Sequence, residues 1–168
     1  MITTPFIQEN ELQYFISCCR TKLTQEYIRK IEDSIAHLTD DDIWWRAHET
    51  NNSIGNLMLH LAGNIRQWIV RHLGEKEFER NRDKEFAERT HIPKGELLAH
   101  LRSAIMEADA VLESFSEKKL LHQYTIQKYT VTGLEAVLHV TEHCSYHTGQ
   151  IVFITKLRTG KDLKFYNL

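Results

Sequence analysis

Residues 133–158 read GLEAVLHVTEHCSYHTGQIVFITKLR, and the spacing of their apolar residues predicts one long helix. The Thr132 hydroxyl can cap its first turn, and Gly160 follows its end. Apolar residues fall on two roughly opposite sides of a helical wheel, namely Leu134, Leu138 and Val152, and Val140, Ile151 and Ile154. Because each apolar side needs cover, we expect one side in a bundle core and the other in a homodimer interface.

Two helices are expected in the first half of the chain. The first covers about residues 10–38, where apolar residues recur at steps of three, four or seven, and it ends before the acidic run at 39–42. The second begins after Asn52 or Ser53, either of which can cap it. It ends at Gly74, where we expect a left-handed C-terminal residue.

A third helix begins at Pro93 and extends to about Phe115, with an amphipathic pattern throughout. A chain of 168 residues is long enough to bury a core without disulfide or metal cross-links, and its length predicts one domain. The pattern therefore predicts an all-α protein, a single four-helix bundle domain spanning residues 1–168.

The remaining segments connect these helices. Residues 75–92 carry charges of both signs and predict a solvated surface connection with one helical turn, pinned by Phe78 and Phe86. Residues 120–132 alternate in polarity and are rich in β-forming residues. We expect a short extended stretch there, crossing the end of the bundle.

Composition limits the possible functions. Hydrophobic residues make up 42% of the chain and charged residues 26%, which excludes a disordered protein. The formal net charge of −2 and the mixed-sign runs argue against nucleic-acid binding. No apolar run is long enough to span a membrane. Residues 1–6 have no basic segment followed by an apolar one, so we expect no signal peptide and a cytoplasmic protein.

The 3 cysteines are odd in number and form no C-x-x-C pair, so they predict neither a disulfide framework nor a zinc ribbon. Small buried thiols in a reducing cytosol are the simpler interpretation. A catalytic thiol at Cys144 stays open as an alternative.

Histidine spacing within 133–158 indicates a metal site. His139, His143 and His147 follow one another at intervals of four residues, which places successive imidazoles one turn apart on nearly the same helix face. Two such rings can hold one ion, and a third ligand should come from a facing helix. The best candidate is His60, beside the small residues Ala62 and Gly63.

Three neutral imidazoles suit a divalent ion such as zinc or nickel and leave a coordination position open for water or a thiolate. His143 and His147 are the expected pair, because three rings on one helix cannot all reach one ion. His139 is then expected to pack beside the site, and Gln150 to orient a bound water or to satisfy a backbone group. The plainer alternative is a structural bundle whose histidines are hydrogen-bonded core residues.

Two strings resemble a known family. The string EHCSYHTGQI at 142–151 resembles the E-H-x-x-Y-H-x-G-Q-[IL] signature of the DinB-like superfamily, which includes the YfiT-type thiol transferases. NSIGNL at 52–57 and LHLAGN at 59–64 resemble its second-helix motif, and RNRDKEF at 80–86 resembles a charged linker of one uncharacterised branch. The resemblance implies an up-down-down-up four-helix bundle, often dimeric, with a metal on His60, His143 and His147.

The histidine site and the resemblance together leave two functions open. The first is a metal-dependent enzyme, a bacillithiol-type S-transferase or a hydrolase, in which a low-molecular-weight thiol or water attacks an electrophilic small molecule. The second is a non-catalytic metal-binding stress-response protein that acts as a dimeric bundle. A small-molecule substrate and a second copy of the chain are the expected partners, with no nucleic acid and no membrane.

Overall fold

The computed structural model describes residues 11–165, which are predominantly helical. The helical elements are α1 (Glu11–Thr21), η1 (Lys22–Tyr27), α2 (Ile28–Ala36), α3 (Asp40–Trp44), α4 (Ile54–Ile65), η2 (Arg66–Leu73), α5 (Arg82–Ala87), α6 (Lys94–Glu113), α7 (Glu117–Leu121) and α8 (Gly133–Thr159). Two strands, β1 (Gln123–Ile126) and β2 (Tyr129–Thr132), precede α8. Residue 10, where the first helix was expected to begin, and residues 1–6, where no signal peptide was expected, lie outside the described residues.

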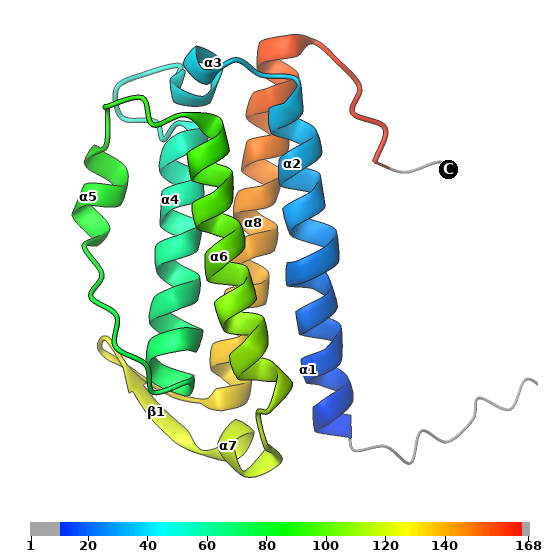
Figure 1. Ribbon diagram of the computed structural model, residues 1–168, viewed down its shortest axis with the longest axis vertical. Helices are drawn as coiled ribbons and strands as arrows, with labels where there is room; N and C mark the ends of the chain where they lie inside the picture. The colour runs from blue at the N-terminus through cyan, green and yellow to red at the C-terminus, as the bar shows by residue number, and fades with distance from the viewer. Residues whose placement is uncertain (1–10, 166–168) are drawn as a thin grey trace, which may run out of the picture.

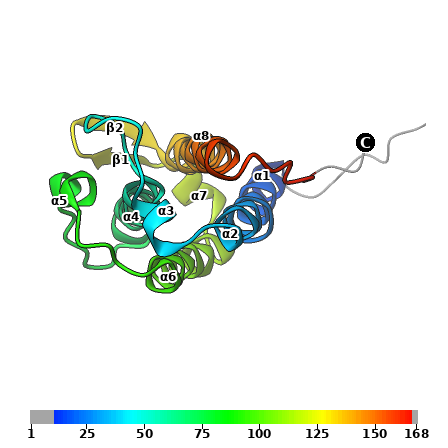
Figure 2. The ribbon, with the colours of Figure 1, turned by 90° about the horizontal axis from the view of Figure 1, so that it is seen from above.

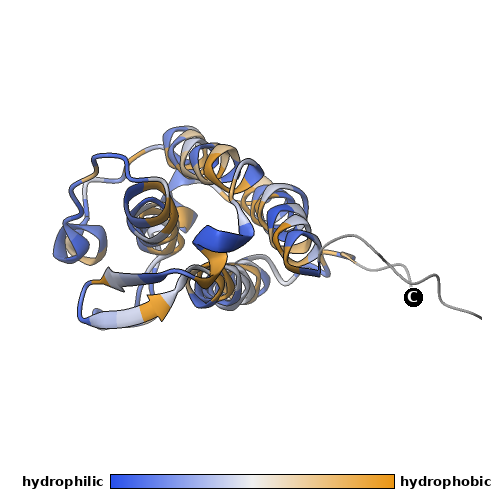
Figure 3. Ribbon diagram, turned by 90° about the horizontal axis from the view of Figure 1, so that it is seen from below, coloured by the Kyte–Doolittle hydropathy of each residue, from blue (hydrophilic) through white to orange (hydrophobic). Residues whose placement is uncertain are grey.

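Four long helical stretches pack side by side and enclose the core (Figures 1 and 2). They are α1 with η1 and α2, α4 with η2, α6, and α8. The π-helical η1 joins α1 to α2, and the π-helical η2 extends α4 to its C-terminal end. Hydrophobic residues gather on the sides of the helices that face one another (Figure 3). No helix of the described stretch is both long and apolar enough to cross a bilayer.

Side-chain caps define where the helices begin. Of the two predicted caps for α4, Ser53 is the one used: it accepts from the Asn56 backbone, and the Asn56 side chain accepts from Ser53. Thr132 and Glu135 form the same reciprocal cap on α8, and Gly160 ends that helix in the left-handed region at φ 64°. Both boundaries of α8 thus follow the sequence-based expectation.

Gly74 corrects one sequence-based expectation. Its φ is −89°, and the left-handed residue is the following Glu75, with φ 54°. A Cβ on Gly74 would lie 2.6 Å from Val111 Cγ2 and 2.7 Å from the Val70 carbonyl oxygen. This glycine is therefore needed for close packing against α6 rather than for a left-handed backbone.

The two apolar sides of α8 have different surroundings. Val140 and Ile151 are fully buried in the core. Leu138 on the opposite side is 39% exposed, and Val152 is half-buried. One apolar side of α8 thus faces the core as the sequence predicts, and the side of Leu138 is partly open in the single chain.

The segment that was expected to be a short extended stretch is an antiparallel hairpin. Gln123 pairs with Thr132 and Ile126 with Tyr129, so that only two residues form the turn. Gln127 takes the left-handed conformation there, with φ 56°. The hairpin and α7 lie at one end of the helices, while α5 lies on the outer side of α4 (Figures 1 and 2).

Candidate metal site

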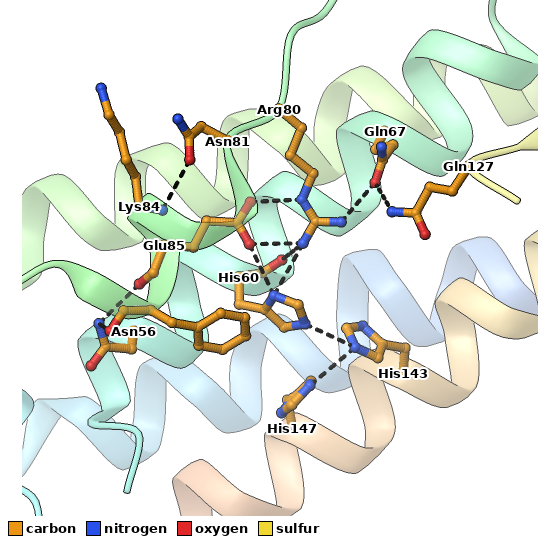
Figure 4. Close-up of polar contacts among 11 residues, drawn as sticks. Asn56, His60, Gln67, Arg80, Asn81, Lys84, Glu85, Gln127, His143 and His147 are labelled. Carbon is orange, nitrogen blue, oxygen red and sulfur yellow. Dashed lines mark hydrogen bonds and ion pairs between the residues drawn. The ribbon is translucent and has the colours of Figure 1, made fainter. Parts of the chain in front are cut away.

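Three histidines from two helices converge on one point (Figure 4). His60 of α4 and His147 of α8 each place their Nε2 atom 3.1 Å from the Nε2 atom of His143. All three nitrogens lie within 4.8 Å of one another, and His60 and His147 are buried. The structure thus brings together the three histidines that their spacing and surroundings had indicated.

The outer nitrogens of two rings have hydrogen-bond acceptors. Glu85 Oε2 lies 2.9 Å from His60 Nδ1, and Gln150 Oε1 lies 2.7 Å from His147 Nδ1. An amide oxygen or a carboxylate only accepts, so these two contacts favour a proton on each Nδ1 and a lone pair on each Nε2. Arg80 Nη2 also lies 3.0 Å from His60 Nδ1, but it donates to Glu85 Oε2 at the shorter distance of 2.8 Å. Gln150 therefore orients a histidine ring.

Ionisation states in the cluster suit metal binding. Burial alone would raise the pKa of Glu85, but hydrogen bonds from Arg80 and His60 outweigh it and hold this pKa below its ordinary value. Burial, and then repulsion from His147 and His60, lowers the pKa of His143 to about 3. Burial also lowers the pKa of His147. At neutral pH the cluster thus has a carboxylate behind His60 and neutral rings on α8.

The geometry fits a divalent ion. Tetrahedral zinc with Zn–N bonds of about 2.0–2.1 Å has ligand nitrogens about 3.3 Å apart, close to the 3.1 Å separations here. The Nε2 lone pairs of His60 and His147 both point toward His143 Nε2. A single proton on His143 Nε2 can form a good hydrogen bond to only one of them. His143 Nδ1 is buried without a hydrogen-bond partner among the described residues. A bound cation would accept the lone pairs of all three rings, whereas hydrogen bonds among the rings cannot pair them all.

Arg80 fixes Glu85 in place behind His60. Its Nε lies 2.7 Å from Glu85 Oε1 and its Nη2 lies 2.8 Å from Oε2, with only 5% and 10% of the two side chains exposed. The remaining Arg80 nitrogen donates to Gln67 Oε1, which also accepts from Gln127 in the hairpin turn. The β-hairpin is thereby linked to the histidine cluster through three side chains (Figure 4).

Gly63 makes this approach possible. A Cβ at this position would overlap the Glu85 carboxylate and would lie 3.0 Å from Arg80 Nε. Asn56 holds the same linker from the other side, because its side-chain amide donates to the Glu85 backbone carbonyl at 2.9 Å. α4 is therefore shaped to receive the linker.

The linker corrects the expectation for residues 75–92. These residues were expected to be a solvated connection, yet Arg80 and Glu85 are buried against α4. The predicted anchor Phe86 is half-buried, with its ring centroid 4.6 Å from that of His60. The other predicted anchor, Phe78, is also half-buried, so the two aromatic residues were the signal in the sequence that the linker packs against the helices.

A pocket of about 470 Å³ adjoins the cluster on the side of the hairpin. His60 and His143 line one wall, and Trp68, Arg82 and Tyr129 line others. Asn64 also lines it and is buried, with no hydrogen-bond partner for its Oδ1 among residues 11–165. A buried acceptor without a partner is costly unless water or a ligand donates to it.

Two further candidates from the sequence lie outside the cluster. His139 packs on Trp68, with ring centroids 4.0 Å apart, which agrees with a packing role beside the site. Cys144 is buried, and burial raises the pKa of its thiol to about 12. A protonated thiol is a poor nucleophile, so the geometry gives no support to catalysis by Cys144.

Comparisons with known proteins identify a structure with a similar fold and the family of the chain. A search of curated proteins finds no match. A solved structure described as the conserved protein of locus from Enterococcus faecalis is similar at a TM-score of 0.70 and 18% identity, covering 86% of this chain and 97% of that one. At that identity the likeness concerns the fold alone. The family model described as "Protein of unknown function (DUF1572)" matches residues 10–168. The chain therefore belongs to the DUF1572 family.

Proposed function

We propose that this protein is a metal-dependent enzyme whose divalent ion, zinc or nickel, is held by His60, His143 and His147. The observation that carries the proposal is the convergence of the three Nε2 atoms, two of them with lone pairs aimed at one point by Glu85 and Gln150. Three imidazole ligands leave a coordination position open, which is typical of catalytic sites. The helical arrangement is, in this proposal, the up-down-down-up bundle of DinB-like and YfiT-like proteins.

A bound divalent ion supplies Lewis acidity, which lowers the pKa of a water or thiol at its free position. The chain's own groups perform the remaining tasks. Glu85 holds the His60 ring in one tautomer and increases its basicity as a ligand, and Arg80 keeps Glu85 ionised and immobile. Gln150 does the same for the ring of His147.

The adjoining pocket is the proposed place for an electrophilic small molecule. Tyr129 offers flat apolar surface, Arg82 offers a positive charge, and Asn64 offers a hydrogen-bond acceptor without a partner among the described residues. Pockets with apolar walls and a few fixed polar groups are the usual form of small-molecule sites. The nucleophile in this proposal is a low-molecular-weight thiol of the bacillithiol type, giving S-transfer, or water, giving hydrolysis.

The alternative is a non-catalytic metal-binding protein that acts as a dimer in a stress response. It is favoured by the exposed apolar residues of α8, among which Tyr146 is 65% and Leu138 is 39% exposed. We also propose the homodimer itself, with the Leu138 side of α8 at the interface. Sedimentation of the Leu138→Glu variant tests it, because a dimer through this side dissociates, whereas a dimer through another surface remains.

Replacing the metal by cobalt(II) distinguishes the proposed enzyme from the non-catalytic metal-binding protein. The enzyme proposal expects the absorption spectrum of cobalt-loaded protein to gain a thiolate-to-cobalt band when bacillithiol or cysteine is added. The His139→Ala variant, which keeps the three proposed ligands, should respond like the wild type. A cobalt spectrum that no thiol changes, together with no exchangeable water on the ion, would favour the non-catalytic protein.

A further inference from the structure

A second pocket lies at the other end of the histidine cluster. It has a volume of about 340 Å³ and is formed by the loop after α3, the start of α4 and the C-terminal half of α8. Gln150 lines it, and the same side chain accepts from His147 Nδ1. Its occupant would therefore lie beside the histidines without touching the hairpin pocket.

Arg46 gives this pocket a half-buried positive charge. Its Nη1 is buried and has no hydrogen-bond partner among the described residues. Burial lowers the pKa of the guanidinium, the charge of Arg89 lowers it further, and Glu49 raises it. Arginine nevertheless stays charged at neutral pH, so a buried N–H without an acceptor is a standing cost that a ligand could remove.

The remaining walls of this pocket are uncharged. Among the described residues that line it, Arg46 is the one charged group, and Glu49, whose charge acts on Arg46, is not part of the lining. Phe153 and Leu157 on α8 are 63% and 59% exposed, and Trp45 is half-buried beside them. Exposed aromatic and aliphatic side chains around a single half-buried cation are complementary to an anion with an apolar body.

We propose that this pocket binds small carboxylates with an apolar body, with the carboxylate on Arg46 and the body on Phe153 and Leu157. Its volume is at the lower end for small-molecule sites, which suits an aromatic or short aliphatic acid. The guanidinium is the group that best matches a carboxylate, because its N–H donors can engage both oxygens. The proposal does not require the metal, so it can fail while the metal site stands.

Calorimetry with 4-phenylbutyrate and its uncharged analogue 4-phenylbutan-1-ol tests the proposal on metal-free wild-type protein. The acid should bind at least about tenfold more tightly than the alcohol, because only the acid forms a charge-assisted pair with Arg46. Equal binding of the two compounds, or no binding of either, would overturn it.

Variants then assign the contacts. Arg46→Gln should remove the preference for the acid and Arg46→Lys should keep part of it, while Arg102→Gln, which removes an exposed arginine on α6, is the matched control. Phe153→Ser should weaken both compounds, whereas Met106→Ser, at an exposed α6 residue outside the pocket, should weaken neither. An Arg46→Gln variant that binds the acid as wild type does would also contradict the proposal. The proposal would also be contradicted if wild-type protein self-associates and Arg46→Gln abolishes this, because the anion on Arg46 would then be a carboxylate of a second chain.

Discussion

Glu85 Oε2 lies 2.9 Å from His60 Nδ1, although the two residues are 25 positions apart and belong to different helices. This contact joins the charged linker to the histidine cluster. It determines which nitrogen of His60 carries the proton, and therefore which nitrogen is free to bind an ion.

Replacing Glu85 by Gln should weaken zinc binding by about 10- to 100-fold, because the ring loses its anionic acceptor and Arg80 loses its ion pair. A competition titration against a zinc chelator measures the change. Glu79→Gln, at an exposed position of the same linker, is the control and should bind zinc as wild type does. Unchanged affinity in Glu85→Gln would mean that the carboxylate stabilises the linker and does not tune the ligand.

Gly63→Ala should also weaken zinc binding while the protein stays folded. The added methyl group overlaps the Glu85 carboxylate, so the linker must move away from His60. Gly149→Ala is the matched control, since nothing lies within 4 Å of a Cβ there. In that exposed helical position alanine should raise stability by about 0.5–1 kcal/mol and leave zinc affinity unchanged. Thermal melting and the chelator titration together distinguish these outcomes.

A pH-dependent stability effect is expected at Glu107, away from the histidines. Arg66 forms two hydrogen bonds to Glu107 at 2.9 Å, and these, against the opposing effect of burial, lower the pKa of Glu107 to about 2. A lowered pKa stabilises the folded state above the unfolded value of 4.5, and this stability is lost as the pH falls toward 2. The side chain is 37% exposed, so solvent screening limits the contribution to about 1 kcal/mol.

The Glu107→Gln variant should accordingly melt a few degrees below wild type at pH 7, and the difference should shrink between pH 5 and pH 2.5. Melting curves of both proteins across that range measure it. A difference that is the same at every pH would show that the carboxylate charge makes no contribution to the effect.

The histidine cluster could be predicted because two of its residues are four positions apart on one helix. Residues four apart on a helix share a face, so His143 and His147 had to point the same way. His60 required one further inference, that small neighbours on its helix permit close approach. The helices themselves followed from apolar periodicity and from the caps at Ser53 and Thr132.

The linker could not be predicted from its sequence, because its charges look like those of a solvated segment. Burial of Arg80 and Glu85 is possible only because they pair with each other and because Gly63 leaves room on a distant helix. The hairpin was only partly foreseen for a similar reason. Its turn uses Gln127 with φ 56°, and glutamine is not a residue that signals such a turn.

Metal content shows whether His60, His143 and His147 hold an ion. Untagged protein reconstituted with zinc or nickel and then dialysed should contain about one ion per chain by elemental analysis. His60→Ala and His143→Ala should each lose that ion, and His139→Ala should keep it, because His139 shares the helix face but packs on Trp68. Wild-type protein without metal after reconstitution, or a His143→Ala variant that keeps a full equivalent, would contradict the account.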